Sequence, residues 1–140
     1  SSILSCDELN NVNIKKTYPR IISTWNHGLE ANQKAWEVLK NGEGGLSAVE
    51  KGVKVSEADP KIRSVGYGGY PDRDGIVTLD ACIMDKNSNC GSVSFLQNIK
   101  HPISVARHVM EDTPHVMLSG KGALDFAIST GFKQADILTD

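Results

Sequence analysis

The chain of 140 residues lacks the features that mark several specialised classes of protein. Its longest unbroken apolar run is ACIM at 81–84, whereas a membrane-spanning helix needs about 20 such residues. Lys and Arg together number 15 against 17 Asp and Glu, a net charge of −2 that offers no basic surface for nucleic-acid phosphates. The sequence therefore predicts a protein with no membrane span and no nucleic-acid partner.

Cysteine is scarce and lacks the spacing of a known framework. The three cysteines, Cys6, Cys82 and Cys90, are an odd number, and none belongs to a CxxC pair or a Cys/His cluster at zinc-ligand spacing. Cys82 lies in an apolar run and is interpreted as a small buried thiol. A Cys82–Cys90 bridge between neighbouring strands is the less favoured alternative. We expect no metal site.

Complete cofactor and catalytic motifs are also missing. The sequence contains no GxGxxG, no complete phosphate-binding loop and no GxSxG, so neither a nucleotide cofactor nor a self-contained serine-hydrolase triad is predicted. The histidines at 27, 101, 108 and 115 have no second histidine or cysteine at helical spacing, which favours surface or capping roles. Ser1 is followed by a polar, Asn-rich stretch at 1–17, interpreted as a mobile tail that would not hold a nucleophile in place.

Hydrophobic periodicity and turn residues predict an α+β chain. Strands are expected from β-branched or apolar runs at 20–25, 76–84, 91–96 and 115–118, the second and third forming a hairpin. Helices are expected from apolar residues at helical spacing between glycine and proline stops, at 28–40, 45–59, 102–110 and 122–130. The predicted architecture is helices packed on a largely antiparallel sheet.

More detailed expectations attach to single positions. Ser47 and Glu50 fit a capping box at the start of the second helix. Strand 76–84 is apolar on both parities apart from Thr78 and Asp80, which predicts a strand covered on both faces. Asp80 is interpreted as a buried acceptor for neighbouring N–H groups. The first two helices are expected to bury apolar stripes made of Leu29, Ala35, Trp36 and Leu39, and of Leu46, Val49 and Val53.

The segment SVGYGGYPD at 64–72 is too rich in glycine for a helix or strand and predicts a shaped loop. With four other motifs in the same order, it resembles the α subunit of the glycosylasparaginase (aspartylglucosaminidase) family. The resemblance extends from about residue 21 to the C-terminus, and its most specific parts are SVGYGGxPD and LDAxIMD. The other motifs are TWN at 24–26, SAVEKG at 47–52, TLDACIMD at 78–85 and IKHPISVAR at 99–107.

The resemblance implies an N-terminal-nucleophile hydrolase with a four-layer αββα sandwich. Residues 18–140 would supply about half of that single domain, and a separate β subunit would complete it. In such enzymes the precursor cleaves itself, and the threonine that begins the β subunit is the nucleophile, with its own α-amino group as base. The implied partners are this β subunit, in an (αβ)2 assembly, and a small glycosylated amino acid as substrate, with no cofactor.

Two positions match the family's active site by resemblance, and a third, His27, departs from it. Trp25 matches the tryptophan that lines the substrate funnel, and Ser64 matches the serine whose hydroxyl lies near the threonine amine and the scissile bond. His27 stands where bacterial relatives often carry Phe, which would make the rim of the funnel more polar. The alternatives are an ordinary core role for Trp25 and an ordinary loop hydroxyl for Ser64.

The implied activity is hydrolysis of the amide between the asparagine side chain and N-acetylglucosamine. A plant-type asparaginase or isoaspartyl peptidase of the same superfamily is the nearest alternative, and a non-catalytic α/β binding module is the alternative from another class. No Asn-x-Ser/Thr sequon occurs, and the stretch around Cys6 loosely matches the end of an export signal. The expected location is therefore a bacterial periplasm or a lipoprotein, or the lysosome if the source is eukaryotic.

Overall fold

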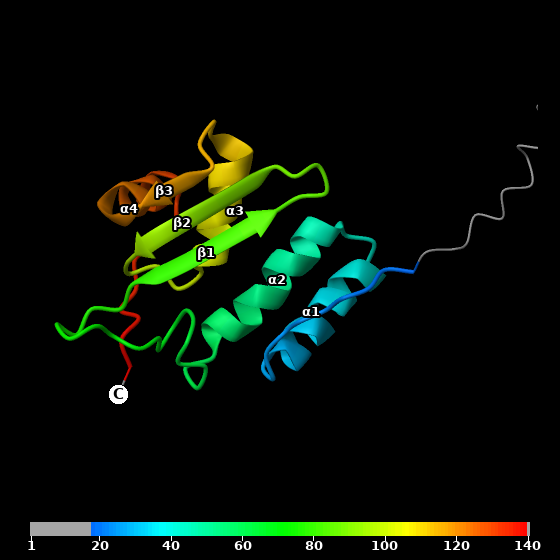
Figure 1. Ribbon diagram of the computed structural model, residues 1–140, viewed down its shortest axis with the longest axis horizontal. Helices are drawn as coiled ribbons and strands as arrows, with labels where there is room; N and C mark the ends of the chain where they lie inside the picture. The colour runs from blue at the N-terminus through cyan, green and yellow to red at the C-terminus, as the bar shows by residue number, and fades with distance from the viewer. Residues whose placement is uncertain (1–17, 140) are drawn as a thin grey trace, which may run out of the picture.

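The computed structural model describes residues 18–139, and the tail expected at 1–17 lies outside them. The described chain is α+β, as predicted (Figure 1). In order, the elements are α1 (Gly28–Lys40), α2 (Gly45–Ala58), β1 (Leu79–Met84), β2 (Cys90–Leu96), α3 (Pro102–Asp112), β3 (Met117–Ser119) and α4 (Gly120–Ser129). In the described part of the chain, no helix is long and apolar enough to span a bilayer.

The sheet has the strand order β1-β2-β3. The predicted hairpin is present, because β1 and β2 pair antiparallel. The sheet is nevertheless mixed, because β2 and β3 pair parallel. A parallel pair needs a crossover connection, and α3 supplies it between these two strands.

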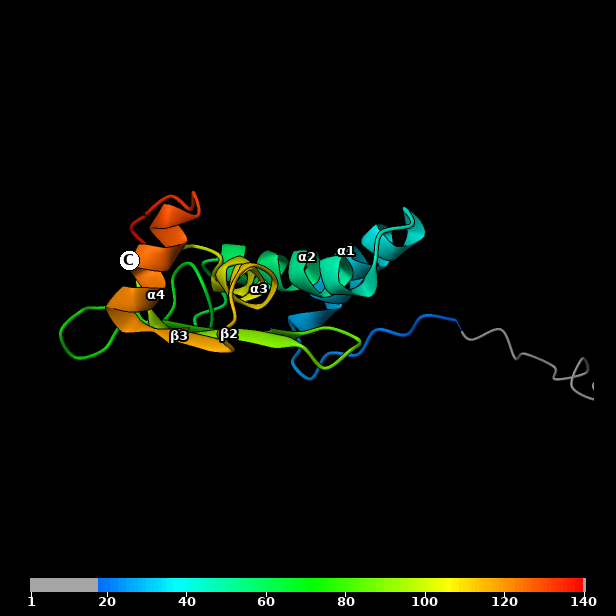
Figure 2. The same cartoon turned by 90° about the horizontal axis from the view of Figure 1, so that it is seen from above.

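The helices α3 and α4 cover one side of the sheet (Figure 2). The main core lies between the sheet and α3 with α4, and its largest fully buried side chains are Leu96, Ile99, Val93, Val105 and Val109. Along β1 the burial alternates, with Leu79 and Ile83 buried and Cys82 and Met84 exposed. Within residues 18–139 the strand is therefore covered on one face only, and the expected cover on the second face is not supplied by this part of the chain.

The segment 20–25 is not a strand, contrary to prediction. Ile22 is 87% exposed and Trp25 is 72% exposed, so Trp25 is not a core residue in the described chain. A strand is defined by hydrogen bonds to a neighbouring strand, and no described strand pairs with this segment. The β-branched run is extended but unpaired.

The first two helices bury only part of the predicted stripes, because Ala35 is buried and Leu39, Leu46 and Val53 pack partly buried against the core clusters. Leu29, Trp36 and Val49 are exposed, contrary to prediction. Most of the buried residues are small, namely Gly28, Ala31 and Ala35 in α1 and Ala48, Gly52 and Ser56 in α2, and Val38 and Glu57 are the larger ones. A Cβ placed on Gly52 would lie only 2.8 Å from the Ala31 carbonyl oxygen. Small residues let two helix backbones approach closely, so the pair packs through them and leaves Leu29, Trp36 and Val49 outward.

Ser47 and Glu50 do not form the predicted capping box. The N-cap of α2 is Gly44, without a side-chain cap, and Ser47 lies inside the first turn. The Arg107 guanidinium instead donates to Ser47 Oγ at 3.2 Å and to Glu50 Oε2 at 2.8 Å. Ser104 Oγ donates to Glu50 Oε1 at 2.6 Å. Sequence spacing suggested a local cap, but the partners come from α3.

This α2–α3 network shifts the pKa values of its charged members. Burial alone would raise the pKa of Glu50, but the hydrogen bonds from Ser104 and Arg107 and the positive charge of Arg107 outweigh it, so the pKa is below its usual value. Burial alone would lower the pKa of Arg107, but its bonds to Glu50 and Glu111 raise it. Both groups therefore remain charged at neutral pH.

Asp80 accepts a structural hydrogen bond, as predicted, although it is exposed rather than buried. Its Oδ1 accepts from the Phe95 backbone N–H at 2.8 Å. Phe95 has a φ of 54°, and the β1–β2 register shifts between Leu79 and Ala81. The carboxylate thus stabilises a β-bulge in which Phe95 adopts a left-handed backbone conformation.

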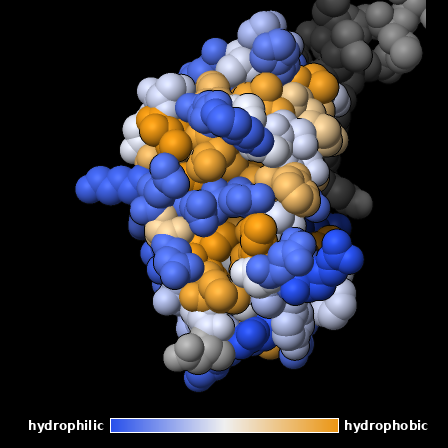
Figure 3. All heavy atoms as spheres, turned by 90° about the vertical axis from the view of Figure 1, so that its left-hand side faces the viewer, coloured by the Kyte–Doolittle hydropathy of each residue, from blue (hydrophilic) through white to orange (hydrophobic). Residues whose placement is uncertain are grey.

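Cys82 and Cys90 are both free thiols, and Cys82 is exposed rather than buried. The register pairs Cys82 with Ser92 and Cys90 with Met84, so the two cysteines are not opposite each other. Cys82 is exposed because it points to the uncovered face of β1. The face seen from the left-hand side of Figure 1 has hydrophobic areas interspersed with hydrophilic ones (Figure 3).

The starts of β1 and α4 differ from prediction. Asp72 accepts the Ile76 backbone N–H through Oδ1 at 2.9 Å and donates its own N–H to the Ile76 carbonyl at 2.9 Å. These bonds close a turn, so β1 begins only at Leu79. The last helix starts directly after β3 at Gly120, whose φ of 55° permits the abrupt change of direction.

Candidate functional site

The glycine loop, residues 63–70, carries Ser64 and closes on itself. The Tyr70 backbone N–H donates to the Arg63 carbonyl at 2.9 Å, and the Arg63 guanidinium lies 5.3 Å from the centre of the Tyr70 ring. Ser64 directly follows Arg63 and is exposed. The predicted shaped loop is present, with Ser64 at its base.

Two glycines allow this loop to pack directly on the end of α2. A Cβ on Gly66 would overlap the Glu57 carbonyl oxygen, and a Cβ on Gly68 would lie 3.0 Å from the Pro60 carbonyl oxygen. Both glycines also have positive φ, 57° and 83°. A side chain at either position would therefore meet both backbone strain and a backbone atom.

Backbone hydrogen bonds also hold the glycine loop, at Tyr67 and Gly68. The Tyr67 backbone N–H donates to the Glu57 carbonyl at 2.7 Å, and the Gly68 N–H donates to the Ile137 carbonyl at 2.8 Å. The Lys100 ammonium lies 5.1 Å from the centre of the Tyr67 ring, a cation–π distance. The loop that carries Ser64 is thus tied to α2, to the start of α3 and to the C-terminal segment.

Trp25 and His27 form a pair of rings just before α1. The ring centroids are 6.3 Å apart and the planes are inclined by 14°, so the rings are stacked. The His27 Nδ1 lies 3.1 Å from Ser56 Oγ, and the His27 backbone N–H donates to Asn26 Oδ1 at 2.9 Å. Trp25 is exposed and His27 is half-buried, which leaves the pair accessible at the surface.

The last turn of α2 brings these two regions together. Ser56 contacts His27, and the next residue, Glu57, holds the glycine loop through its carbonyl oxygen. Trp25, His27 and Ser64 come from two segments about 40 residues apart in sequence, yet both segments are anchored to consecutive residues of one helix. The two segments that carry the predicted site residues therefore both contact the last turn of α2.

Sequence reasoning missed Glu57, the most deeply buried carboxylate of this region. It is 2% exposed, and its Oε1 accepts the Ile103 backbone N–H at 2.9 Å while its Oε2 lies 3.1 Å from His101 Nδ1. The prediction of a surface or capping role for His101 did not include this partner. The sequence did contain a signal for the burial of Glu57. Glu50 and Glu57 are seven residues apart and lie on the same helix face as Val53, which was predicted to be buried.

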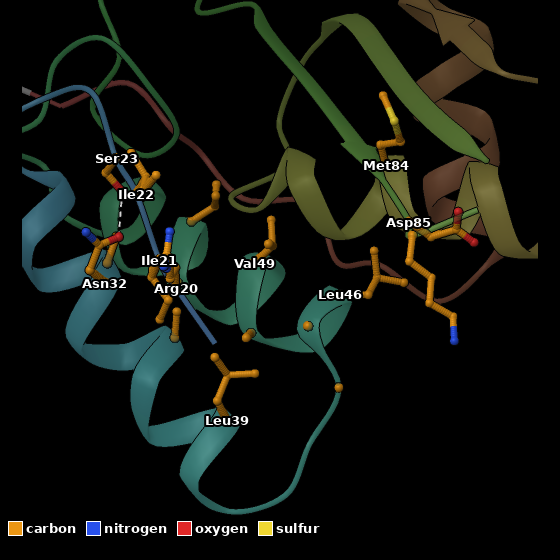
Figure 4. Close-up of a pocket in the computed structure, with 18 residues that line it drawn as sticks. Arg20, Ile21, Ile22, Ser23, Asn32, Leu39, Leu46, Val49, Met84 and Asp85 are labelled. Atoms are coloured by element: carbon orange, nitrogen blue, oxygen red, sulfur yellow. Dashed lines mark hydrogen bonds between the residues drawn. The ribbon is translucent and has the colours of Figure 1, made fainter. Parts of the chain in front are cut away.

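A groove of about 900 Å³ lies along α1 and α2, and Trp25, His27 and Ser64 are not among the residues that line it (Figure 4). The extended residues Arg20–Ser23 form one wall, α1 and α2 form the floor with Leu39, Leu46 and Val49, and the tip of β1 with Met84 lies at the far end. Ser23 Oγ donates to Asn32 Oδ1 at 2.6 Å and ties the extended segment to α1. The large apolar side chains that the helix pair turns outward, such as Val49, therefore line an open groove.

Within residues 18–139, no group of three or more His, Cys, Asp or Glu side chains is arranged to hold a metal ion. The site is built from hydroxyl, imidazole, indole and backbone groups. Such groups orient a substrate or another catalytic group by hydrogen bonding and stacking.

This α+β architecture and its glycine loop agree with the comparison to known proteins. A family model described as asparaginase matches residues 13–140. The chain belongs to the asparaginase family. One relative, the N(4)-(β-N-acetylglucosaminyl)-L-asparaginase of Elizabethkingia miricola, is 65% identical over 121 residues, which cover 86% of this chain and 36% of that protein. The protein of the same name from Rattus norvegicus is 42% identical over 123 residues, covering 87% of this chain and 35% of its own length.

The chain spans about a third of the length of these curated relatives. The uncovered sheet face and the open groove lie on a chain that corresponds to only part of each relative.

Proposed function

We propose that this chain is the α-subunit portion of an amidohydrolase that cleaves N4-(β-N-acetylglucosaminyl)-L-asparagine. The observation that carries the proposal is the 65% identity over 121 residues to a bacterial enzyme whose name states that substrate. The structure adds a discrete loop bearing Ser64 and an exposed Trp25–His27 pair, both anchored to the end of α2.

The nucleophile is proposed to be the N-terminal threonine of a partner β chain, released by self-cleavage of a common precursor. Its hydroxyl oxygen forms a bond to the carbonyl carbon of the substrate side chain, and the hydroxyl proton passes to its own α-amino group. The ordinary pKa of an α-amine is about 7.7–8.0, which suits a base near neutral pH. The C–N bond then breaks, the glycosylamine leaves with that proton, and water hydrolyses the resulting ester to release aspartate.

The residues of this chain would support that reaction by positioning. The Ser64 hydroxyl, fixed at the base of the glycine loop, would hold the threonine amine by a hydrogen bond. Trp25 would form a rigid wall of the substrate funnel, and His27 would form part of its rim. No cofactor is required, because the nucleophile and base both belong to the threonine.

The proposed assembly is an αββα sandwich in which residues 18–140 supply about half of one domain, arranged as (αβ)2. Two features of the structure support it. The sheet has one uncovered face, where Phe95 and Met84 are 53% and 62% exposed, and the groove beside α2 is open. A second sheet and its helices on that face would complete the four layers. The proposed location is a bacterial periplasm or a lipoprotein, or a lysosome.

The native protein tests this proposal by intact-mass measurement and activity. We expect a second chain beginning with threonine to co-purify, and N4-(β-N-acetylglucosaminyl)-L-asparagine to be hydrolysed faster than β-aspartyl dipeptides. Preference for the dipeptides would instead support an isoaspartyl peptidase. A stable single chain with neither activity would support a non-catalytic module.

Ser64→Ala tests the role of the loop hydroxyl. Because Ser64 is exposed, its truncation should leave the melting temperature unchanged while slowing both self-cleavage and amide hydrolysis, by about 10-fold or more for a lost orienting contact. Ser129→Ala is the matched control, since its hydroxyl donates only to the Phe126 carbonyl within α4 among the described contacts. Unchanged kinetics in Ser64→Ala would contradict the assigned role.

A further inference from the structure

Ser56 is a buried hydroxyl with a long-range partner. It is 5% exposed and lies in the last turn of α2, while His27, whose Nδ1 is 3.1 Å from its Oγ, precedes α1 by one residue. This contact joins residues 29 positions apart. A buried side-chain hydroxyl needs a hydrogen-bond partner, and the imidazole provides one.

The backbone around His27 is held on both sides. The His27 N–H donates to Asn26 Oδ1, and the Gly28 N–H donates to the Trp25 carbonyl at 2.9 Å. A Cβ on Gly28 would overlap the Ser23 Cβ, so the turn is packed against the extended segment. With the backbone fixed, the remaining freedom of His27 is rotation of its side chain, and the contact to Ser56 removes it.

The geometry of the ring then determines what His27 presents to its surroundings. The two nitrogens of an imidazole point in widely different directions, so a ring whose Nδ1 faces buried Ser56 directs Nε2 away from the helix end. The His27 ring is also stacked with the exposed Trp25 ring. The pair therefore presents the apolar indole surface next to one polar atom, the Nε2 of His27.

We propose that Ser56 is a positioning residue that orients the His27 imidazole so that its Nε2 edge binds the sugar of the substrate. The class of ligand is a hydroxyl- and amide-bearing glycosyl group, because Trp25 offers a stacking face and Nε2 offers one hydrogen bond. This inference rests on the proposed function. Ser56 would contribute to the preference for a glycosylated substrate, and it would do so only by orienting His27.

A double-mutant cycle in the two-chain enzyme tests the proposal. The variants are Ser56→Ala, His27→Phe and the double variant, each assayed with N4-(β-N-acetylglucosaminyl)-L-asparagine and with L-asparagine, which has no sugar. We expect Ser56→Ala to raise KM for the glycosylated substrate about 3- to 10-fold with kcat unchanged, as for the loss of one hydrogen bond. KM for L-asparagine should not change, and Ser56→Ala should have no further effect in the His27→Phe background.

Ser104→Ala is the matched control, because Ser104 is also a 5% exposed helical serine but donates to Glu50 instead. It should lower stability and leave both KM values unchanged. Ser56→Thr retains the hydroxyl and should restore the wild-type KM if it folds. Equal increases in KM for both substrates in Ser56→Ala would overturn the proposal. It would also be overturned if Ser56→Ala raised KM for the glycosylated substrate as much in the His27→Phe background as in the wild type.

An independent readout separates this inference from the proposed function. Nitrogen-15 NMR of the His27 ring reports its orientation and tautomer without any activity, and Ser56→Ala should shift both ring resonances while Ser104→Ala should not. If the wild type fails to hydrolyse the glycosylated substrate, the proposed function is overturned, and with it the sugar contact. Unchanged ring resonances in Ser56→Ala would overturn the positioning role itself.

Discussion

Single residues determine how closely the backbone segments of the site approach one another. The glycine loop packs on the end of α2 because Gly66 and Gly68 have no side chains there. Glycine in this stretch was evident in the sequence and predicted a loop, but the surface against which it packs was not. That surface is the backbone of Glu57, a residue nine positions earlier whose burial depends on Ile103 and His101.

Gly66→Ala should be much more destabilising than an equivalent change in an open turn. Gly66 has a φ of 57°, and a methyl group there would overlap the Glu57 carbonyl, whereas Gly75 has a φ of 81° and open space around it. We expect Gly75→Ala to lower the free energy of unfolding by about 1 kcal/mol, the backbone term alone. Gly66→Ala should lower it by at least about 2 kcal/mol, because the clash with backbone adds to that term.

Chemical denaturation of both variants, with circular dichroism as the signal, measures this difference. Similar losses of stability at the two positions would show that the loop relaxes away from α2 at little cost.

At the scale of elements, polar side-chain contacts as well as apolar packing set the relation between α2 and α3. Both helices were predicted from sequence, and α3 begins with Pro102 at its first position as expected. The predicted buried face of α2 is present in part, because Leu46 and Val53 pack on the main core. Glu50 and Glu57 also occupy inward positions, which periodicity treats as polar surface. Their partners lie on α3 more than 40 residues away, beyond any local pattern.

The α2–α3 network should make the protein less stable in acid. The pKa of Glu50 is lower in the folded state than its ordinary value of 4.5. Its contribution to stability is therefore complete above pH 4.5 and is lost as the pH falls from that value through the lower folded pKa. Glu50→Gln should lower the free energy of unfolding at pH 7 by about 1–3 kcal/mol and flatten its pH dependence below pH 4.5.

Urea unfolding at a series of pH values checks this prediction. Glu43→Gln is the control, since Glu43 pairs with Lys51 at the surface, where both side chains are about 40% exposed, and exposed pairs contribute little. If Glu50→Gln loses stability below pH 4.5 as steeply as the wild type, the acid dependence belongs to other carboxylates.

At the scale of the whole molecule, the sheet is covered on one side and open on the other (Figure 2). The strand pattern alone suggested cover on both faces, because the segment 76–84 carries apolar side chains at both parities. In the described chain only one parity is buried, and Met84, Phe95 and Met117 remain exposed. Asp80 holds the Phe95 backbone in its left-handed conformation on this strand pair. Such a backbone conformation costs free energy in a residue other than glycine, and strained residues of this kind cluster at functional surfaces.

Phe95→Asp should weaken association with the proposed β chain without unfolding this one. Phe95 is 53% exposed, so a charge there costs little in the isolated chain but would be buried in the assembly. Ile128→Asp in α4 is the control, because Ile128 is 43% exposed and lies on a helix rather than on the uncovered strands. We expect tagged Phe95→Asp to retain less β chain on affinity purification, and Ile128→Asp to retain as much as the wild type.

Equal retention of the β chain by both variants would place the interface elsewhere on the molecule. Loss of helical circular dichroism in Phe95→Asp would instead indicate that the bulge is required for folding.

The sequence by itself determined the secondary structure class, the hairpin, the glycine loop and the family, because turn residues, local periodicity and contiguous motifs carry that information. Only the tertiary structure decided that small residues join α1 to α2, that Glu50 and Glu57 face inward, and that Ser56 holds His27. Each of these depends on contacts between residues about 20 to 60 positions apart, which no local pattern encodes. The scarcity of long apolar runs, of paired cysteines and of complete catalytic motifs excluded several classes of protein. The uncovered sheet face and the open groove are tertiary features, and they are the surfaces at which we propose that a second chain joins this one.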